Sequence, residues 1–218
     1  MEPIIALTFD DGLLKHVEIA RLLAKLNVRA TFFIITHLKM FEEKPLLTQN
    51  TELIVELVEL GHEVASHSCT HPVLPLLPQD KLVSELRESK RFLEDITGKE
   101  VLGFAYPYGL YSARVVKAVM KYYKYARATD ILPYDDPLNK DIKLNPLRRF
   151  VIGSSGVRTI GTVMLHLLNP RSRFEAYPTI FIHKINTTTM LLLIKLLKML
   201  GVKFITLSEL VNKCCTDE

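Results

Sequence analysis

The sequence predicts an α/β fold, specifically a distorted (β/α) barrel of seven or eight strands related to the TIM barrel. Short runs rich in β-branched and aromatic residues alternate with longer segments of helical period, as in βαβ units. About seven or eight such units follow one another, and no linker or internal repeat divides them. A single domain over residues 1–218 is therefore expected. An open doubly wound sheet is the alternative.

The strands predicted in the first half of the chain are short and apolar. Each is followed by a segment with apolar residues at helical spacing. Gly61 and Gly98 follow two of these helices, where a glycine commonly ends a helix. The predicted strands are residues 4–9, 29–35, 63–66 and 101–106, and the predicted helices are residues 16–26, 53–60, 79–96 and 112–122.

The second half continues the alternation. Residues 132–146 are polar and contain prolines, which predicts a long loop. Ser208 is predicted to cap a short terminal helix. The remaining predicted strands are residues 125–128, 149–152, 179–183 and 203–206, and the remaining helices are residues 159–168 and 188–200.

Composition limits the classes of function. The chain has 218 residues, 48% hydrophobic and 24% charged, so it can bury one sizeable core. Its 28 basic and 24 acidic residues are interleaved, and without a basic run nucleic acid is not an expected partner. Three cysteines, two of them adjacent, make no disulfide framework. No secretory leader or bilayer-spanning segment is recognised, so we expect a cytoplasmic location and no membrane contact.

Carboxylate and imidazole side chains follow several of the predicted strands. Asp10 and Asp11 follow the first strand, His67 and His71 follow the third, and His183 ends a late one. Active sites of α/β barrels and sheets form at the carboxyl ends of the strands. We therefore expect these side chains to converge.

Two imidazoles and a carboxylate suit a divalent metal ion. His67 and His71 are four residues apart, and both rings lie on one face if the chain turns helically after the strand. With one carboxylate they form a common ligand set for Zn²⁺ and related ions, which leaves positions for water and substrate. Gly12 allows a sharp turn after the paired aspartates, so one could bind the metal while the other stays close to the bound water.

Four segments resemble, in order, motifs of the polysaccharide deacetylases, the NodB-homology domains of carbohydrate esterase family four. They run from the first strand to a late one, so the resemblance covers nearly the whole chain, as a single catalytic domain. The segments are Thr8-Phe9-Asp10-Asp11-Gly12, residues 61–71 (GHEVASHSCTH), Phe104-Ala105-Tyr106-Pro107-Tyr108-Gly109 and Ile180-Phe181-Ile182-His183.

The resemblance implies a metal-dependent hydrolase that removes an acyl group from an amide nitrogen. Asp11, His67 and His71 match the metal ligands of the family. The expected ion is Zn²⁺, with Co²⁺ or Ni²⁺ as alternatives. The implied fold is a distorted (β/α) barrel, in agreement with the strand pattern.

The resemblance also implies the groups that carry the chemistry. Asp10 matches the catalytic base, and His183 matches the general acid that protonates the leaving nitrogen. Tyr108 matches the tyrosine whose backbone N–H helps to stabilise the oxyanion.

Two features depart from the pattern of the family. Its third motif often carries an arginine that pairs with the catalytic base, and Ala105 stands at that position here, as in a sub-branch with Ala-Tyr-Pro-Tyr-Gly. Its fourth motif usually contains a tryptophan, and this chain has none. We hypothesise that Arg149 supplies the missing positive charge.

Several other histidines and a cysteine are interpreted as structural. His62, at the start of a strand, is predicted to support the fold outside the site, and His166 to pack in a helix. Solvated loop positions are favoured over substrate contacts for His16 and His37. Cys69 lies between the two histidine ligands, and its side chain is expected to point away from both.

Three functions are weighed. The first is an N-deacetylase acting on an amino sugar or oligosaccharide. The second applies the same chemistry to a small cytosolic amide, because no export signal is recognised. The third is a non-catalytic carbohydrate-binding protein, suggested by Ala105 and the missing tryptophan motif. Metal content would separate the third from the others. The oligomeric state is not predicted.

Overall fold

The central element of the computed structural model is a curved sheet of eight strands. The structure describes residues 4–128, 155–156, 179–182 and 185–215. The strand order is β7-β6-β5-β2-β1-β9-β8, with β10 also paired to β1, and every pair in this sheet is parallel. The strands are β1 Ile4–Phe9, β2 Thr31–Ile34, β5 Glu63–Ser66, β6 Gly103–Ala105, β7 Tyr125–Arg127, β8 Ser155–Gly156, β9 Thr179–Ile182 and β10 Lys203–Ile205.

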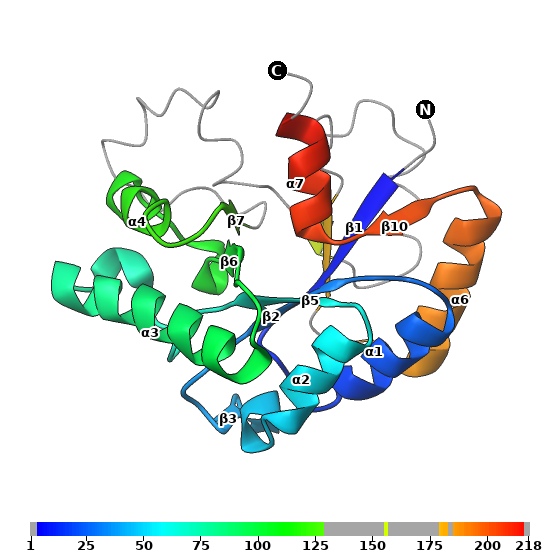
Figure 1. Cartoon of the computed structure of the whole chain (residues 1–218), viewed down its shortest axis with the longest axis horizontal. Helices are drawn as coiled ribbons and strands as arrows, with labels where there is room; N and C mark the ends of the chain where they lie inside the picture. The colour runs from blue at the N-terminus through cyan, green and yellow to red at the C-terminus, as the bar shows by residue number, and fades with distance from the viewer. Residues whose placement is uncertain (1–3, 129–154, 157–178, 183–184, 216–218) are drawn as a thin grey trace.

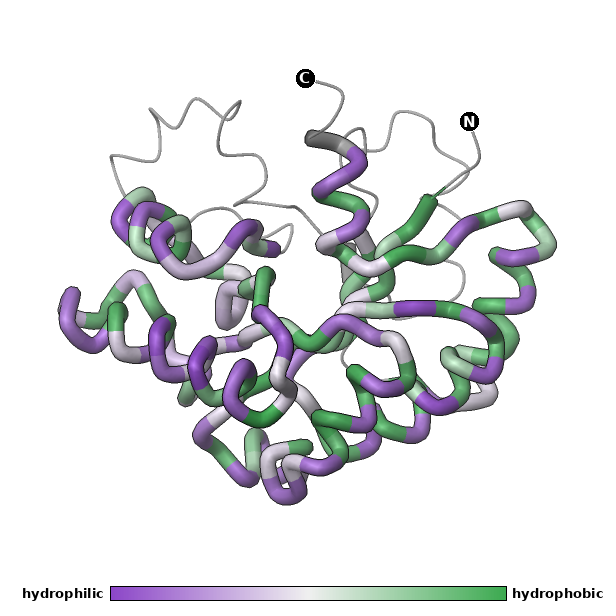
Figure 2. The backbone as a smooth tube through the Cα atoms, in the orientation of Figure 1, coloured by the Kyte–Doolittle hydropathy of each residue, from purple (hydrophilic) through white to green (hydrophobic). Residues whose placement is uncertain are grey.

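Helices α1, α2, α3, α4 and α6 lie around the outside of this sheet, and α7 packs on its inner side (Figure 1). Their tubes alternate between hydrophobic and hydrophilic residues, because one side of each faces the sheet and the other faces solvent (Figure 2). No helix in the part of the chain that the structure describes is both long and apolar enough to cross a bilayer. The helices are α1 His16–Lys25, α2 Glu52–Glu59, α3 Gln79–Thr97, α4 Ala113–Val119, α6 Thr187–Met199 and α7 Leu207–Cys215.

The first strand is the centre of the sheet. Ala6 is opposite both Thr179 of β9 and Ile205 of β10, so these two strands pair with opposite edges of β1. Thr8 and Phe9 pair with β2, which therefore shares an edge with β10. The carboxyl end of β1 thus lies between β2 and β9, with neighbours on both sides.

Side chains alternate along the strands between two apolar clusters, as the pleat of a strand requires. In β1, Ile5, Leu7 and Phe9 join the larger cluster between sheet and helices, whereas Ala6 joins a smaller cluster. The smaller cluster lies on the inner side of the curved sheet, and α7 contributes three of its residues. Its buried members are Ala6, Phe33, Ala65, Ala105, Tyr125, Leu207, Leu210 and Val211.

Small inward-facing residues make room for large ones in this interior. A Cβ atom on Gly103 would lie 2.2 Å from the ring of Tyr125. Real Cβ contacts are never this short, so the position of Tyr125 requires a glycine on the neighbouring strand. The small residue on β6 therefore fixes where the tyrosine of β7 lies.

A polar cluster closes the interior at the amino ends of the strands. The carboxylate of Glu63 accepts hydrogen bonds from the hydroxyls of Tyr125 and Thr31, both at 2.8 Å, and from the backbone N–H of Ser208 at 3.1 Å. Burial raises the pKa of Glu63, and the hydrogen bonds that its carboxylate accepts lower that pKa. These bonds tie β2, β5 and β7 to the start of α7. We call Glu63, Tyr125, Thr31 and Ser208 the amino-end cluster.

The curled parallel sheet confirms the predicted barrel rather than a flat doubly wound sheet. The predicted strands and helices are present with small shifts at their ends, wherever the structure describes them. Predicted elements at residues 132–146, 149–152 and 159–168 lie outside the described residues. One prediction is wrong: Thr206, not Ser208, caps α7. Its hydroxyl accepts from the N–H of Glu209, whose carboxylate accepts from the N–H of Thr206.

A small antiparallel hairpin was not predicted. Its strands are β3, Met40–Phe41, and β4, Lys44–Pro45, and the two turn residues Glu42 and Glu43 have φ values of 45° and 60°. Turns of this kind usually contain Asn or Gly, so a Glu-Glu pair gives no signal in the sequence. A backbone bond from Leu47 N–H to the carbonyl of Gly12, 2.8 Å, anchors the following segment beside the end of β1.

Candidate metal centre and its surroundings

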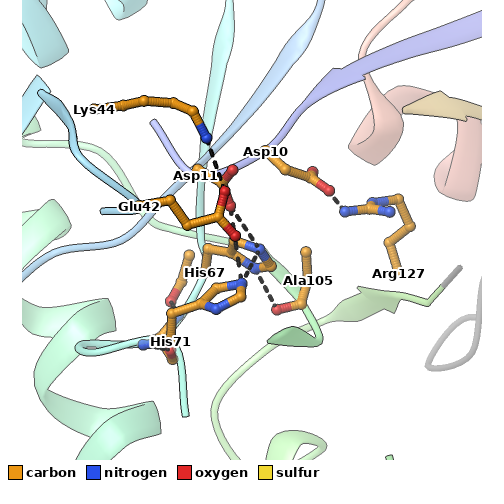
Figure 3. A network of polar contacts seen from close by, with 10 residues as sticks. Asp10, Asp11, Glu42, Lys44, His67, His71, Ala105 and Arg127 are labelled. Atoms are coloured by element: carbon orange, nitrogen blue, oxygen red, sulfur yellow. Dashed lines mark hydrogen bonds and ion pairs between the residues drawn. The ribbon is translucent and has the colours of Figure 1, made fainter. Parts of the chain in front are cut away.

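Asp11, His67 and His71 bring three ligand atoms together at the carboxyl ends of β1 and β5. The two Nε2 atoms are 3.2 Å apart, and they lie 3.7 and 3.8 Å from Oδ1 of Asp11 (Figure 3). All three residues are buried. Among the described residues they form the only group of three potential ligands with this proximity. The structure thus brings together the three residues that the sequence predicted.

The spacing of these atoms fits one small cation. Three atoms separated by these distances share a central point about 2.1 Å from each, the length of a zinc–nitrogen or zinc–oxygen bond. Two imidazoles and one carboxylate are also a ligand set that zinc, cobalt and nickel accept. The residues present therefore fit a divalent metal ion.

The tautomer of His67 is fixed by its neighbour. Its Nδ1 is 2.9 Å from the backbone carbonyl of Ala105, which can only accept, so Nδ1 carries the proton. Burial lowers the pKa of His67, although Asp10 and Asp11 act in the opposite direction. A neutral ring with its proton on Nδ1 presents the lone pair of Nε2 to the centre, as a metal ligand must.

The two histidines are close without lying on a helix. β5 ends at Ser66, and the residues that follow form bends, with φ values of 66° at Ser68 and 57° at His71. The helical turn on which the sequence argument relied is absent from this segment. Instead, Ser68, which directly follows His67, and His71 itself have left-handed conformations, and the two ring centroids lie 4.6 Å apart. The predicted proximity is confirmed, and it arises without a helical turn.

The side chains of Asp10 and Asp11, which follow β1, point in different directions (Figure 3). Asp11 has a φ of 70° and Gly12 one of 67°, so the chain turns sharply there, as expected. A side chain on Gly12 would approach Ile34 to 3.0 Å. Because of this turn, Asp11 faces the two histidines while Asp10 faces β7.

Asp10 forms a buried ion pair with Arg127, the last residue of β7. Arg127 Nη2 donates to Asp10 Oδ1 at 2.5 Å, and the two side chains are 1% and 3% exposed. The guanidinium carbon lies 5.0 Å from the ring centre of Phe33 and 5.3 Å from that of Phe181, which favours a delocalised cation. Arg127 therefore holds the carboxylate that the family resemblance identifies as the base.

Sequence reasoning missed Arg127. It assigned the missing positive charge to Arg149, which lies outside the described residues, whereas Arg127 already contacts Asp10. The strand around Tyr125 was predicted, and its period of two places Arg127 on the same inward face as Tyr125. The inward position of this arginine at the carboxyl end of a strand could therefore have identified it as a candidate site residue.

Two aromatic rings flank His71. Phe41, from the unpredicted hairpin, and Tyr108 each lie 4.5 Å from the imidazole, measured between ring centres. Tyr108 has a φ of 58° and is 47% exposed. Its side chain thus borders the candidate centre, while the oxyanion role of its N–H remains a prediction. His183, the predicted general acid, lies outside the described residues.

The residues interpreted as structural have mixed outcomes. His62 is buried, accepts from the N–H of Ala30 at Nδ1, and lies outside the centre, as predicted. Cys69 contacts the backbone carbonyl of Glu85 through its sulfur, away from the centre, and burial raises its pKa to about 12. His37 is exposed. The interpretation of His16 as a solvated loop residue is wrong: it is 1% exposed and packs against Phe9.

The fold and the site together define an α/β-barrel protein with a candidate metal centre beside a carboxylate–guanidinium pair. The model of the polysaccharide deacetylase family matches residues 1–126, so the chain belongs to the polysaccharide deacetylase family. This confirms the resemblance seen in the motifs.

Two named deacetylases are similar in sequence to about half of this chain. It is 33% identical over 122 residues to a chitooligosaccharide deacetylase of Rhizobium leguminosarum bv. phaseoli, covering 53% of this chain and 49% of the relative. It is 31% identical over 117 residues to the peptidoglycan-N-acetylglucosamine deacetylase PgdA of Listeria monocytogenes, covering 53% of this chain and 23% of PgdA. The chain thus spans about half or less of the length of these relatives.

A solved structure supports the fold over nearly the full length. The carbohydrate esterase family four domain of a multidomain xylanase, from the hindgut metagenome of Trinervitermes trinervoides, superposes with a TM-score of 0.67 and 21% identity. The match covers 98% of this chain and 91% of that domain. The similarity concerns the distorted barrel alone.

Proposed function

We propose that the chain is a divalent-metal-dependent N-deacetylase that acts on an N-acetylated amino sugar or on an oligosaccharide of such sugars. The observation that carries the proposal is the convergence of Asp11, His67 and His71 within 3.8 Å of one another. The names of the relatives support the substrate class, since two of them are deacetylases of chitooligosaccharide and of peptidoglycan N-acetylglucosamine.

The proposed metal is held by Asp11, His67 and His71, and Zn²⁺ is the first candidate. A divalent ion in such a site lowers the pKa of water towards about 7 and polarises a carbonyl oxygen. Binding requires neutral imidazoles, and burial lowers the pKa of His67, which favours its neutral form.

In the proposed reaction, Asp10 takes a proton as water attacks the acyl carbon. Arg127 holds the carboxylate of Asp10 in place. The position of Asp10 beside the candidate metal ligands suits the role of general base. Tyr108 N–H is proposed to donate to the oxyanion, which is typically worth about 3 kcal/mol. His183 is proposed to protonate the leaving nitrogen, and acetate and a free amine are the products.

The test is acetate release from N-acetylated sugars, chitooligosaccharides and small amides, with and without a chelator. We expect release from at least one sugar, its loss on chelation, and its recovery when Zn²⁺ is restored. Asp10→Asn is the control, since it removes the base and leaves the three candidate ligands in place. Release that persists in the chelated protein would contradict the proposal.

The same panel addresses the two alternatives. Release from small amides alone would favour the cytosolic amide hydrolase. Absence of both zinc binding and acetate release would favour a carbohydrate-binding protein on the same fold. The ion pair of Asp10 with Arg127 speaks for catalysis, because a binding protein has no need of a buried carboxylate beside a metal. The cytoplasmic location stays a prediction.

A further inference from the structure

The loop that joins the two histidine ligands belongs to no helix or strand, although the carbonyls of Ser68 and Cys69 accept from the N–H groups of Thr36 and His37. It follows β5 without forming a helix, and Ser68 and His71 have left-handed backbone conformations. Such conformations cost about 1–3 kcal/mol each for residues other than glycine, and they persist only where the surroundings enforce them. Buried backbone N–H groups in the loop also need acceptors. The N–H groups of this loop must therefore find acceptors among side chains.

Side-chain oxygens accept from four consecutive N–H groups of the loop. Ser66 Oγ accepts from Ser68 at 3.2 Å, and Ser68 Oγ accepts from His71 at 3.0 Å. The two groups between them, of Cys69 and Thr70, donate to one oxygen of Glu85 at 2.8 and 3.0 Å. Among the described residues, Glu85 is the only side chain from another element that accepts from these N–H groups.

The second oxygen of Glu85 is engaged as well. It accepts from the hydroxyl of Thr70 at 2.7 Å, so one carboxylate makes three hydrogen bonds to two adjacent loop residues. Hydrogen bonds to an ionised acceptor are about twice as strong as neutral ones. The carboxylate therefore restrains the loop in position and in orientation.

The helix that carries Glu85 is itself fixed to the strand that carries His67. Ser66 at the end of β5 donates to Ser89 of α3 at 2.8 Å, and the hydroxyl of Ser89 reaches the backbone carbonyl of Glu85 at 2.6 Å. The helix thus offers a firm support from which a side chain can hold the loop.

We propose that Glu85 is a positioning residue for the metal centre, which fixes His71 relative to His67 through the backbone of Cys69 and Thr70. This inference rests on the proposed function, since it assumes that the two histidines bind a metal. Glu85 does not reach the candidate ligands itself. Removing it would release the loop and let the two Nε2 atoms move apart, which weakens metal binding.

The experiment is zinc affinity, measured by competition with a chelating dye and without substrate. We expect Glu85→Ala to weaken zinc binding by roughly 10- to 100-fold, as loss of an outer support of a metal ligand typically does. Glu88→Ala is the matched control, because Glu88 lies on the same helix and pairs with Arg87. It should bind zinc within about twofold of the wild type.

A second pair of variants separates positioning from general loss of stability. Thr70→Val removes only the hydroxyl contact and should weaken zinc binding less than Glu85→Ala does. The double variant should bind no more weakly than Glu85→Ala alone, because both changes break the same contact. Where Glu85→Ala does not fold, Glu85→Gln, which keeps one acceptor, should still bind zinc more weakly than Glu88→Ala.

Wild-type zinc affinity in folded Glu85→Ala, or in Glu85→Gln when the alanine variant does not fold, would overturn this inference and leave the proposed function standing. Zinc binding by the wild type with no acetate release from any sugar would end the proposed function instead, while the effect of Glu85 on zinc could still be measured.

Discussion

Strands β5 and β7 carry a polar group at each end, and the two ends are built differently. At their amino ends, Glu63 and Tyr125 belong to the amino-end cluster, where hydroxyl and N–H donors meet a single carboxylate. At their carboxyl ends, His67 belongs to the candidate metal centre, where its Nε2 lone pair faces a second imidazole and a carboxylate, and Arg127 pairs with Asp10 beside that centre.

The different surroundings of the polar groups indicate different roles for the amino and carboxyl ends of these strands. A carboxylate surrounded by donors is satisfied within the chain, and it stabilises the fold without any ligand. Three ligand atoms that converge around one point are complemented best by a cation. Polar groups at the amino ends should therefore affect stability, and those at the carboxyl ends should affect metal binding and catalysis.

The largest effect is expected at the metal ligands. Asp11→Asn removes the only negative charge of the three-residue group, so zinc affinity should fall by more than about 100-fold and acetate release should be lost. Dye competition gives the affinity, and urea unfolding of the metal-free protein checks the fold. An unchanged zinc affinity would show that the carboxyl ends of the strands do not hold the metal.

The next effect concerns the buried ion pair. Arg127→Ala leaves the carboxylate of Asp10 buried without its partner, which should cost about 3–5 kcal/mol of unfolding free energy. Zinc affinity should change much less than in Asp11→Asn. Arg127→Lys should recover part of the stability and little of the activity, because a lysine cannot reproduce the flat cation between Phe33 and Phe181. Full activity in Arg127→Ala would show that catalysis does not need Arg127.

A smaller effect is expected in the amino-end cluster. Tyr125→Phe removes one donor from Glu63 and should lower the unfolding free energy by about 1–3 kcal/mol. Zinc affinity and kcat/KM should stay close to those of the wild type. Tyr122→Phe serves as the control, since Tyr122 lies outside the cluster. A loss of zinc binding in Tyr125→Phe would show that the two ends are coupled.

The smallest effect is a pH dependence. Burial lowers the pKa of His62 below 6.5, so the unfolded chain takes up the proton first as the pH falls. The stability that neutral His62 contributes is present above about pH 6.5 and is lost as the pH falls through the lowered pKa. In the metal-free protein, the difference in unfolding free energy between wild type and His62→Gln should shrink between pH 7.5 and 5 by about 1 kcal/mol or less. A constant difference would contradict this account.

The barrel could be predicted from the sequence because its strands and helices carry strong periodic patterns. The convergence of the candidate ligands could be predicted because Asp11, His67 and His71 follow strands whose carboxyl ends lie at one end of the sheet, and the choice of Asp11 over Asp10 came from the family resemblance. The hairpin at residues 40–45 could not, because its turn contains no residue that favours positive φ.

Other features depend on distant contacts that no local pattern carries. Arg127 lies 117 residues from Asp10, and Glu85 lies on a helix whose charged residues all look solvated in sequence. The conformation of the loop between the histidines could not be predicted, since spacing alone does not reveal the side chains that hold Ser68 and His71 in left-handed conformations.

The central place of β1 has a consequence for synthesis. The residues that supply the three candidate ligands leave the ribosome before β9 and β10, which flank β1. Until those strands arrive, β1 has bare edges that invite wrong pairing. We therefore expect a nascent chain to complete its candidate metal centre only after β9 and β10 have paired with β1.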